Sequence, residues 1–415
     1  MLISKIKSQL SNQFIRNAGW MGGAELANRV FRLGTTVILA RMFSPEDYGL
    51  MSIIYTTYAF ANVFTLRGGI SAKIIQADEK DVKAIAETSY WLNWILCVAI
   101  FFIQCIAAFP IAHFYHKQQL VPLICTAALT YLMLPLSMVN SAIIERENRL
   151  KITALCNVIS SVISNSLTII MVISGVGIWA IVWAMVAATP VWIVITWINH
   201  PWRPPYRFKL ENSQEIINFG GNLLGVDLLN KVKENIDYLI VGRFLGIEAL
   251  GIYYFAFNAG SGISMNVMNS FSSAMFPYLC EARGNIKQLE ERFFSSLKKT
   301  CVIIVPLIIL QASLAPFYVP LVFGEKWIPA IPILITICLS ALPFPIGYAV
   351  FHLLNAVDKT RISLYWTLSQ TVLFAIGILI TVRWGIFGVA ASVLVFQWLA
   401  LIFYIWIIKY VFINK

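Results

Sequence analysis

Two stretches of this chain, residues 19–51 and 221–253, repeat each other without a gap, and both place charges inside a long apolar segment. Glu25 and Arg29 of the first copy return as Asp227 and Lys231 of the second. Identical pairs include Gly19 and Gly221, Gly23 and Gly225, Asn28 and Asn230, Arg41 and Arg243, and Glu46 and Glu248. Since a charge inside a membrane helix is rare unless it has a function or a partner, the duplication predicts two similar halves with a shared polar feature.

The composition places the chain in a membrane: 59% of residues are hydrophobic, 12% are charged, and the mean hydropathy is +0.75. A spanning helix needs about 20 mostly apolar residues. The uncharged runs cover 48–66, 88–116, 118–144, 152–202, 249–276, 300–324, 327–357, 362–382 and 384–408. Ser174-Gly-Val-Gly177 divides the longest run into two. Together with the two charged repeat helices, we expect an all-α polytopic membrane protein with twelve transmembrane helices.

Further repeats indicate that the whole chain is duplicated. Lys151-Ile152 matches Arg361-Ile362, and Gly177-Ile-Trp-Ala180 matches Gly385-Ile-Phe-Gly388. Each copy has six helices, an even number, so both copies begin on the same side of the membrane. We therefore expect two parallel-repeat six-helix lobes around a central cavity. The expected parts are an interfacial amphipathic helix (1–17), an N-lobe with helices 1–6 (18–198), a cytoplasmic linker (199–214) and a C-lobe with helices 7–12 (215–415).

Basic residues are distributed unevenly among the expected loops. Of the 31 Lys and Arg residues, most lie in the termini and in the loops after even-numbered helices. The opposite face has only Arg41, Lys117, Arg243, Lys326 and Arg383. Because cytoplasmic loops retain positive charge, we expect both termini in the cytoplasm. Anionic lipid headgroups account for the net charge of +11, so no nucleic-acid partner is expected.

Each charged repeat helix has a polar face. At 100° per residue, four polar side chains of each helix fall within an arc of about 100°. These are Glu25, Asn28, Arg29 and Arg32 in the first helix, and Asp227, Asn230, Lys231 and Glu234 in the second. A central charge facing lipid costs roughly 2.5 to 3.5 kcal/mol, so these faces predict a watery cavity lined with cations.

The alternative is that Glu25 with Arg29, and Asp227 with Lys231, form ion pairs one helical turn apart that only hold the halves together. This interpretation leaves Arg32 without a partner in its own helix. An excess of cations in a membrane cavity favours binding of a phosphate-bearing headgroup.

Three other basic residues have weaker links to this cavity. Lys233 lies off the polar arc and is predicted to pair with Asp237. Arg41 and Arg243 end the two repeat helices, where a cation complements the helix dipole, so we expect them to be structural.

Backbone features add two expectations. Gly19-x-x-x-Gly23 and Gly221-x-x-x-Gly225 predict close approach of a neighbouring helix. Pro343-Phe-Pro345 predicts a break in an apolar span.

The sequence lacks the motifs that several classes of enzyme and ATP-driven transporter need. It has no G-x-x-x-x-G-K-[ST] loop, so ATP use is not expected, and no metal or organic cofactor is predicted. Asp-x-Asp is absent and the expected outer loops are short, which disfavours a membrane glycosyltransferase, polymerase or ligase. We therefore do not expect an enzyme.

Several motifs resemble the polysaccharide transporter family of the MOP superfamily, which includes O-antigen and exopolysaccharide flippases. Ala40-Arg-Met-Phe-Ser-Pro-Glu-Asp-Tyr-Gly-Leu50 looks like the family's signature at the end of the first helix. Phe276-Pro277, the basic segment 146–151 and Gly177-Ile-Trp-Ala180 are similar to that family too. The second copy lacks the Ser-Pro-Glu-Asp-Tyr run and has Gly246-Ile-Glu-Ala-Leu250 instead.

The resemblance implies a flippase of the bacterial cytoplasmic (inner) membrane that moves undecaprenyl-diphosphate-linked oligosaccharide, such as a lipopolysaccharide or exopolysaccharide repeat unit, by alternating access. Arg29, Arg32 and Lys231, with Asn28 and Asn230, would hold the diphosphate. An H⁺ or Na⁺ gradient acting through Glu25, Asp227, Glu234 or Asp237, or the membrane potential, would drive transport.

We expect a monomer that works among membrane lipids with polysaccharide polymerase and assembly proteins. A multidrug or small-molecule exporter of the same superfamily would share this architecture and is the alternative.

Overall fold

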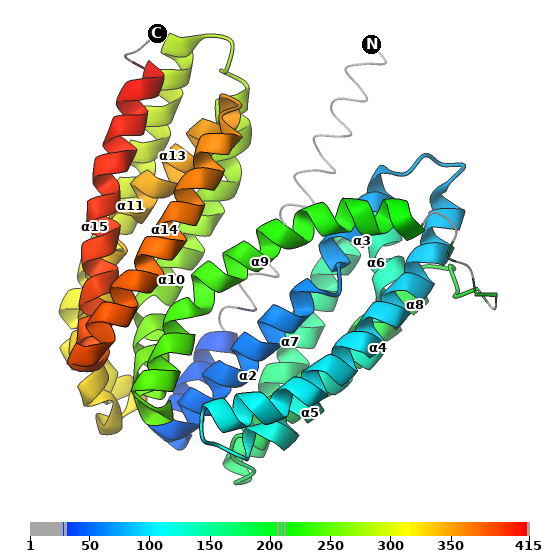
Figure 1. The fold of residues 1–415 in the computed structure, drawn as a ribbon, viewed down its shortest axis with the longest axis horizontal. Coiled ribbons are helices and arrows are strands. Elements are labelled where there is room, and N and C mark those ends of the chain that lie inside the picture. The colour runs from blue at the N-terminus through cyan, green and yellow to red at the C-terminus, as the bar shows by residue number, and fades with distance from the viewer. Residues whose placement is uncertain (1–27, 29–30, 206, 209, 211–212, 413–415) are drawn as a thin grey trace. The chain divides into compact units, whose positions relative to one another are not determined.

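The computed structural model describes residues 28, 31–205, 207–208, 210 and 213–412, and within these ranges every regular element is a helix (Figure 1). The expected all-α fold is confirmed. The interfacial helix predicted over 1–17 lies outside the described residues and stays a prediction.

The chain divides into two compact units, and the boundary lies within one helix. Unit 1 contains the described residues up to Lys231, and unit 2 contains those from Val232 onward. Helix α9, Ser213–Phe244, spans this boundary. The lobes predicted at 18–198 and 215–415, with their linker at 199–214, stay a prediction.

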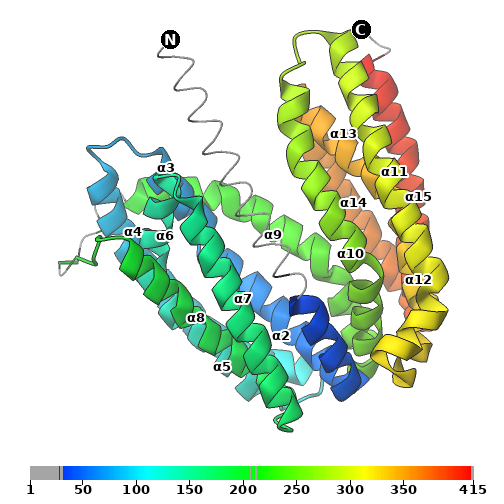
Figure 2. The same cartoon turned by 180° about the vertical axis from the view of Figure 1, so that it is seen from behind.

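Unit 1 begins with helical residues 31–42. Its further helices are α2 (Pro45–Val63), α3 (Arg67–Gln76), α4 (Val82–Phe114), α5 (Leu120–Met133), α6 (Pro135–Arg146), α7 (Leu150–Ile173) and α8 (Trp179–Asn199). Helix α8 lies beside α5 and α7 (Figure 2). The break between α7 and α8 confirms the division predicted at Ser174–Gly177, where Gly175 and Gly177 both have positive φ.

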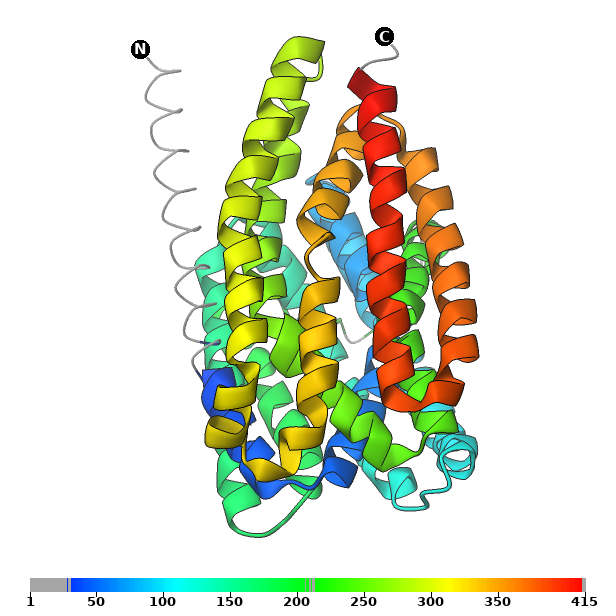
Figure 3. The same cartoon turned by 90° about the vertical axis from the view of Figure 1, so that its left-hand side faces the viewer.

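Unit 2 continues from α9 with a similar series. Its elements are α10 (Ile247–Cys280), α11 (Ile286–Tyr318), the short η1 (Val319–Phe323) and η2 (Glu325–Ala330), α12 (Ile331–Ser340), α13 (Phe344–Ala356), α14 (Thr360–Thr381), η3 (Val382–Trp384) and α15 (Gly385–Phe412). The break predicted at Pro343–Pro345 is confirmed between α12 and α13, beside α15 (Figure 3). Pro135 stands at the corresponding break in unit 1, where α5 and α6 meet at 51°.

The apolar helices establish a multi-pass membrane protein. In the described part of the chain, seven helical segments are long and apolar enough to cross a membrane, or eight if α5 and α6 together form one span. One of them, Thr360–Phe412, contains both α14 and α15. These two helices run antiparallel, because later residues of α14 contact earlier residues of α15. The ring centres of Trp366 and Phe403 are 3.5 Å apart, and those of Phe374 and Phe396 are 5.6 Å apart. The predicted number of twelve also includes charged helices such as α9.

Each unit has its own apolar core. In unit 1, buried side chains of α3, α4 and α6 form one cluster, which Ile216 at the start of α9 joins. In unit 2, a second cluster joins α10, α11, α13 and α15. The close helix approach predicted at Gly221 and Gly225 is wrong, since a Cβ at either position would meet nothing within 4 Å. Gly220 makes the close contact instead, against α3.

Candidate functional site

The first charged helix is described at Asn28 and from residue 31 onward. Arg32 is exposed, and Oγ1 of Thr36 donates to its backbone carbonyl at 2.8 Å. Asn28 is partly buried, and its Oδ1 accepts no hydrogen bond from the described residues. Glu25 and Arg29 lie outside the described residues, so their pairing and their place in a cavity stay predictions.

The second polar face lies on α9. Asp227, Asn230 and Glu234 are exposed, and Lys231 is partly buried. Lys231 and Glu234 both interact with neighbouring groups. Local pairing and ligand binding therefore remain alternative hypotheses for this face, as they were from the sequence.

Asp237 occupies a different environment, three residues beyond Glu234 on α9. Asp237 is buried, with 4% of its surface exposed. Oδ2 accepts from the Tyr253 hydroxyl at 2.9 Å, and Oδ1 accepts from the Tyr238 backbone N–H at 2.9 Å. The predicted pairing of Lys233 with Asp237 is wrong, because Lys233 is exposed and no ion pair joins the two described side chains.

Aromatic rings surround this carboxyl group within unit 2. The Tyr238 ring lies 5.9 Å from Tyr253, 5.3 Å from Tyr254 and 5.8 Å from Phe257, centroid to centroid. A buried carboxylate is costly unless its oxygens are hydrogen-bonded, and both oxygens of Asp237 have a donor. This geometry suits an anchor between α9 and α10 better than a group that exchanges ions with water.

The break between α2 and α3 brings a cation into the second span, which runs from Pro45 to Gln76. Leu66 has a φ of 52°, in the left-handed region, so α2 stops and α3 restarts at Arg67. The break is held by Thr65, whose carbonyl accepts from Asn93 Nδ2 at 3.1 Å. Because Thr65 and Asn93 are each 1% exposed, this bond satisfies a backbone group that the broken helix leaves inside the protein.

The Arg67 side chain is exposed at this break. Its guanidinium carbon lies 5.2 Å from the centre of the Trp192 ring. Trp192 stands seven residues before α8 ends at Asn199, about 10 Å along the helix axis. Arg67 forms no ion pair within the described chain. An exposed guanidinium inside a span can donate two parallel hydrogen bonds to a phosphate group.

Arg67 was missed from the sequence because the uncharged run 48–66 ends just before it, which placed it in the loop after the second expected helix. The structure corrects this, since 67–76 are helical. The apolar residues on both sides of Lys73 were the signal that the span continued.

The motif Ser44-Pro-Glu-Asp47 forms the start of α2. Ser44 Oγ accepts from the Asp47 N–H at 3.1 Å, and Asp47 Oδ2 accepts from the Ser44 N–H at 2.9 Å. This reciprocal capping box satisfies two N–H groups that a helix start leaves open. In the second copy, Gly246 caps α10 without a side-chain bond and with a φ of 90°. The motif is therefore a device for starting a helix.

The charged residues at the neighbouring helix ends have positions that suit a structural role. Glu46 forms an ion pair with Lys117, which links the start of α2 to the loop before α5. Arg243 lies in the last turn of α9, where its charge complements the helix dipole, and Arg41 is placed similarly one residue before its helix ends. Both arginines are exposed and both interact with neighbouring groups.

Comparison with known families decides the identity of the fold. The family described as polysaccharide biosynthesis protein matches residues 38–332, which include the capping motif, the broken second span and α9. The chain belongs to this family. The resemblance to the polysaccharide transporters of the MOP superfamily, noted from the sequence, is thereby confirmed.

Two proteins with assigned names are similar to this chain over most of its length. The teichuronic acid biosynthesis protein TuaB of Bacillus subtilis (strain 168) is 24% identical over 378 residues, which are 91% of this chain and 78% of TuaB. The lipopolysaccharide biosynthesis protein WzxC of Escherichia coli (strain K12) is 25% identical over 398 residues, which are 94% of this chain and 79% of WzxC.

Solved structures of MOP superfamily transporters share the fold of this family member. The inward closed conformation of the lipid II flippase MurJ matches with a TM-score of 0.76 and 14% identity, over 94% of this chain and 87% of MurJ. An inward-facing multidrug resistance transporter of the MATE family matches with a TM-score of 0.75 and 16% identity, over 92% of this chain and 94% of that protein. The chain is thus a membrane protein with a transporter fold.

Proposed function

We propose that this chain is a flippase that moves an undecaprenyl-diphosphate-linked oligosaccharide, an O-antigen or exopolysaccharide repeat unit, across the bacterial cytoplasmic membrane. The family and its relatives named for lipopolysaccharide and teichuronic acid synthesis support a glycan substrate. The fold shared with a lipid II flippase supports a lipid-linked one. The observation that carries the proposal is Arg67, an exposed guanidinium at a helix break inside an apolar span.

In this proposal, twelve helices form two six-helix lobes that rock about a central cationic cavity, and both termini are cytoplasmic. Arg29, Arg32 and Lys231 hold the diphosphate, with Asn28 and Asn230 beside them. Arg67 joins them as a further phosphate-binding group. The polyprenyl tail stays in the lipid while the sugar head crosses.

The driving force needs no hydrolysis. An inside-negative potential favours outward movement of an anion by about 2.3 kcal/mol per charge per 100 mV. If H⁺ or Na⁺ is exchanged, the exposed carboxylates Asp227 and Glu234, with Glu25, suit that role better than the buried and doubly bonded Asp237. We expect a monomer that delivers its cargo to polysaccharide polymerase and assembly proteins.

The test is glycan export in a strain that lacks the chromosomal copy. Arg67→Glu, and the double change Arg29→Glu with Lys231→Glu, should abolish surface polysaccharide while membrane levels of the protein stay normal. Arg67→Lys should retain part of the export, because it keeps the charge but loses the paired donors. Lys80→Glu, in the exposed loop before α4, is the matched control and should export normally. Normal export by the folded charge-reversal variants would refute the cationic site.

A multidrug exporter is the second candidate, which the shared MATE fold favours. It predicts that loss of the chain sensitises cells to cationic drugs and leaves surface glycan intact. The flippase proposal predicts the opposite pair of results in the same strain.

A further inference from the structure

The turn before the fifth helix of each repeat has the same backbone in both units. Asn148 and Asp358 stand at matching positions, with φ of 56° and 61°. The next residues, Arg149 and Lys359, precede α7 and α14 with φ/ψ of −90°/48° and −100°/42°. The turn is therefore a true structural repeat, and differences between its side chains can be compared position by position.

In unit 1, a guanidinium fills the corner beside this turn. Arg146 Nη1 donates to the carbonyl oxygens of Ile74 and Ile75, at 3.0 and 2.8 Å, and to that of Ala77. Its Nη2 lies 3.1 Å from Oε1 of Glu79. Arg146 thus ties the end of α6 to the end of α3.

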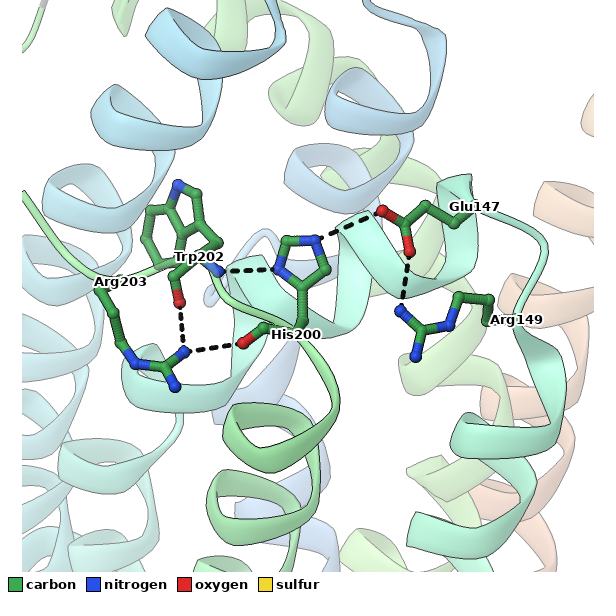
Figure 4. A network of polar contacts seen from close by, with 5 residues as sticks. All are labelled: Glu147, Arg149, His200, Trp202 and Arg203. Atoms are coloured by element: carbon green, nitrogen blue, oxygen red, sulfur yellow. Dashed lines mark hydrogen bonds and ion pairs between the residues drawn. The ribbon is translucent and has the colours of Figure 1, made fainter.

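The next residue extends this polar network. Glu147 lies 3.0 Å from Nη1 of Arg149 and 3.4 Å from Nε2 of His200 (Figure 4). The other ring nitrogen of His200 accepts from the Trp202 backbone N–H at 3.1 Å, and Arg203 donates to the His200 carbonyl at 2.7 Å. The charged side chains Arg146, Glu147 and Arg149 thus all contact other groups of unit 1.

Unit 2 has a different network at this corner, in which Arg292 of α11 donates to the Tyr278 carbonyl oxygen at 2.7 Å and lies 2.9 Å from Oε2 of Glu281. Ala356 and Val357 stand where unit 1 has Arg146 and Glu147. A cavity of about 260 Å³ lies beside them. It is lined by Arg283, Ile286, Leu289, Ala356, Val357, Asp358, Lys359 and Val411. The cavity is far larger than one water needs and close to the lower limit for small-molecule pockets.

The lining has an apolar part and a cationic part. Ile286 is exposed, whereas Leu289 and Val411 are buried, and Arg283 is exposed. Lys359 Nζ lies 4.0 Å from the centre of the Tyr410 ring, which holds the ammonium group in place. Asp358 is the one carboxylate in the lining, so two cations face one anion. Neither Arg283 nor Lys359 forms an ion pair within the described residues.

We propose that this cavity binds the phosphate group of an anionic phospholipid at the predicted cytoplasmic surface. Arg283 and Lys359 are the donors to the phosphate oxygens. The apolar residues accept the glycerol and first acyl carbons, which a free phosphate does not have. Such a site would anchor the end of unit 2 to the inner leaflet, and it is independent of the glycan substrate.

Native mass spectrometry of the purified full chain in detergent tests the site, with phosphatidylglycerol as the probe and zwitterionic phosphatidylcholine for comparison. The double variant Arg283→Gln, Lys359→Gln should weaken binding of the first phosphatidylglycerol about 25-fold, since each basic side chain near a membrane surface contributes about fivefold. Ala356→Arg should prevent binding, because its longer side chain would occupy part of the cavity.

Lys287→Gln is the matched control, since Lys287 is exposed, follows the lining residue Ile286 on α11 and lies outside the lining. Binding by the double variant that equals binding by the wild type and by Lys287→Gln would overturn the proposal, whether or not Ala356→Arg folds. Displacement of phosphatidylglycerol by an equal concentration of inorganic phosphate would overturn the lipid source and assign the site to a soluble phosphate.

Discussion

Gly69 of α3 and Gly220 of α9 meet backbone to backbone: a Cβ on Gly69 would lie 2.5 Å from the Gly220 Cα. No side chain stands between the two helices at this point, and the backbone cannot move aside as a flexible side chain can. The contact joins the helix that begins with Arg67 to the first turns of the charged helix α9.

We expect Gly69→Ala to destabilise the protein by roughly 1 to 3 kcal/mol, the usual cost of overpacking. The measurement is the melting temperature of the purified protein in detergent, followed by tryptophan fluorescence. Gly68→Ala is the matched control, because a Cβ there would meet nothing within 4 Å and alanine favours a helix. Gly220→Ala should cost less than Gly69→Ala, since its Cβ would first meet a Leu66 side chain at 3.4 Å. Equal melting temperatures for Gly68→Ala and Gly69→Ala would contradict the close contact.

The capping box gives a second prediction, which concerns the most family-like motif of the chain. Ser44→Ala removes the acceptor of the Asp47 N–H and should cost about 0.5 to 2 kcal/mol. Because the motif starts a helix, glycan export per folded molecule should stay normal. Ser174→Ala, another exposed serine at a helix end, should change the melting temperature less. A folded Ser44→Ala protein that no longer exports glycan would instead place the motif in substrate binding.

The sequence predicted those features of the fold that depend on local chemistry. Glycines at 175 and 177 ended α7, and Pro343 broke the span between α12 and α13, because these residues restrict or release the backbone wherever they stand. The prediction of span ends from uncharged runs failed at Arg67, because a charged residue was assumed to end a membrane span. The bond from Asn93 to Thr65 that supports this broken helix joins residues 28 apart in the chain.

The candidate site was predictable only in part, for a related reason. Helical spacing placed Asp227, Asn230 and Glu234 on one accessible face of α9. The same spacing suggested a partner for Asp237 on its own helix. The real partner is Tyr253 of α10, 16 positions away, which one helix pattern cannot indicate.

The Tyr253–Asp237 contact provides the third prediction. Tyr253→Phe conserves the ring but removes the donor to Oδ2, and a buried acceptor without its donor costs roughly 1 to 3 kcal/mol. The melting temperature should therefore fall, whereas Tyr365→Phe, on a side chain that is 67% exposed, should leave it unchanged.

A companion variant separates anchoring by Asp237 from ion coupling. Asp237→Asn can keep both contacts, since its Oδ1 can accept from the Tyr238 N–H while its Nδ2 donates to the Tyr253 hydroxyl oxygen, but it removes the charge and the exchangeable carboxyl proton. If Asp237 is an anchor, this variant should keep most of the wild-type stability and export glycan normally. Asp227→Asn and Glu234→Gln, on the exposed face, should then be the changes that reduce export if an ion is exchanged. A stable Asp237→Asn protein without export would show that the buried carboxyl group, rather than the exposed ones, carries the coupling ion.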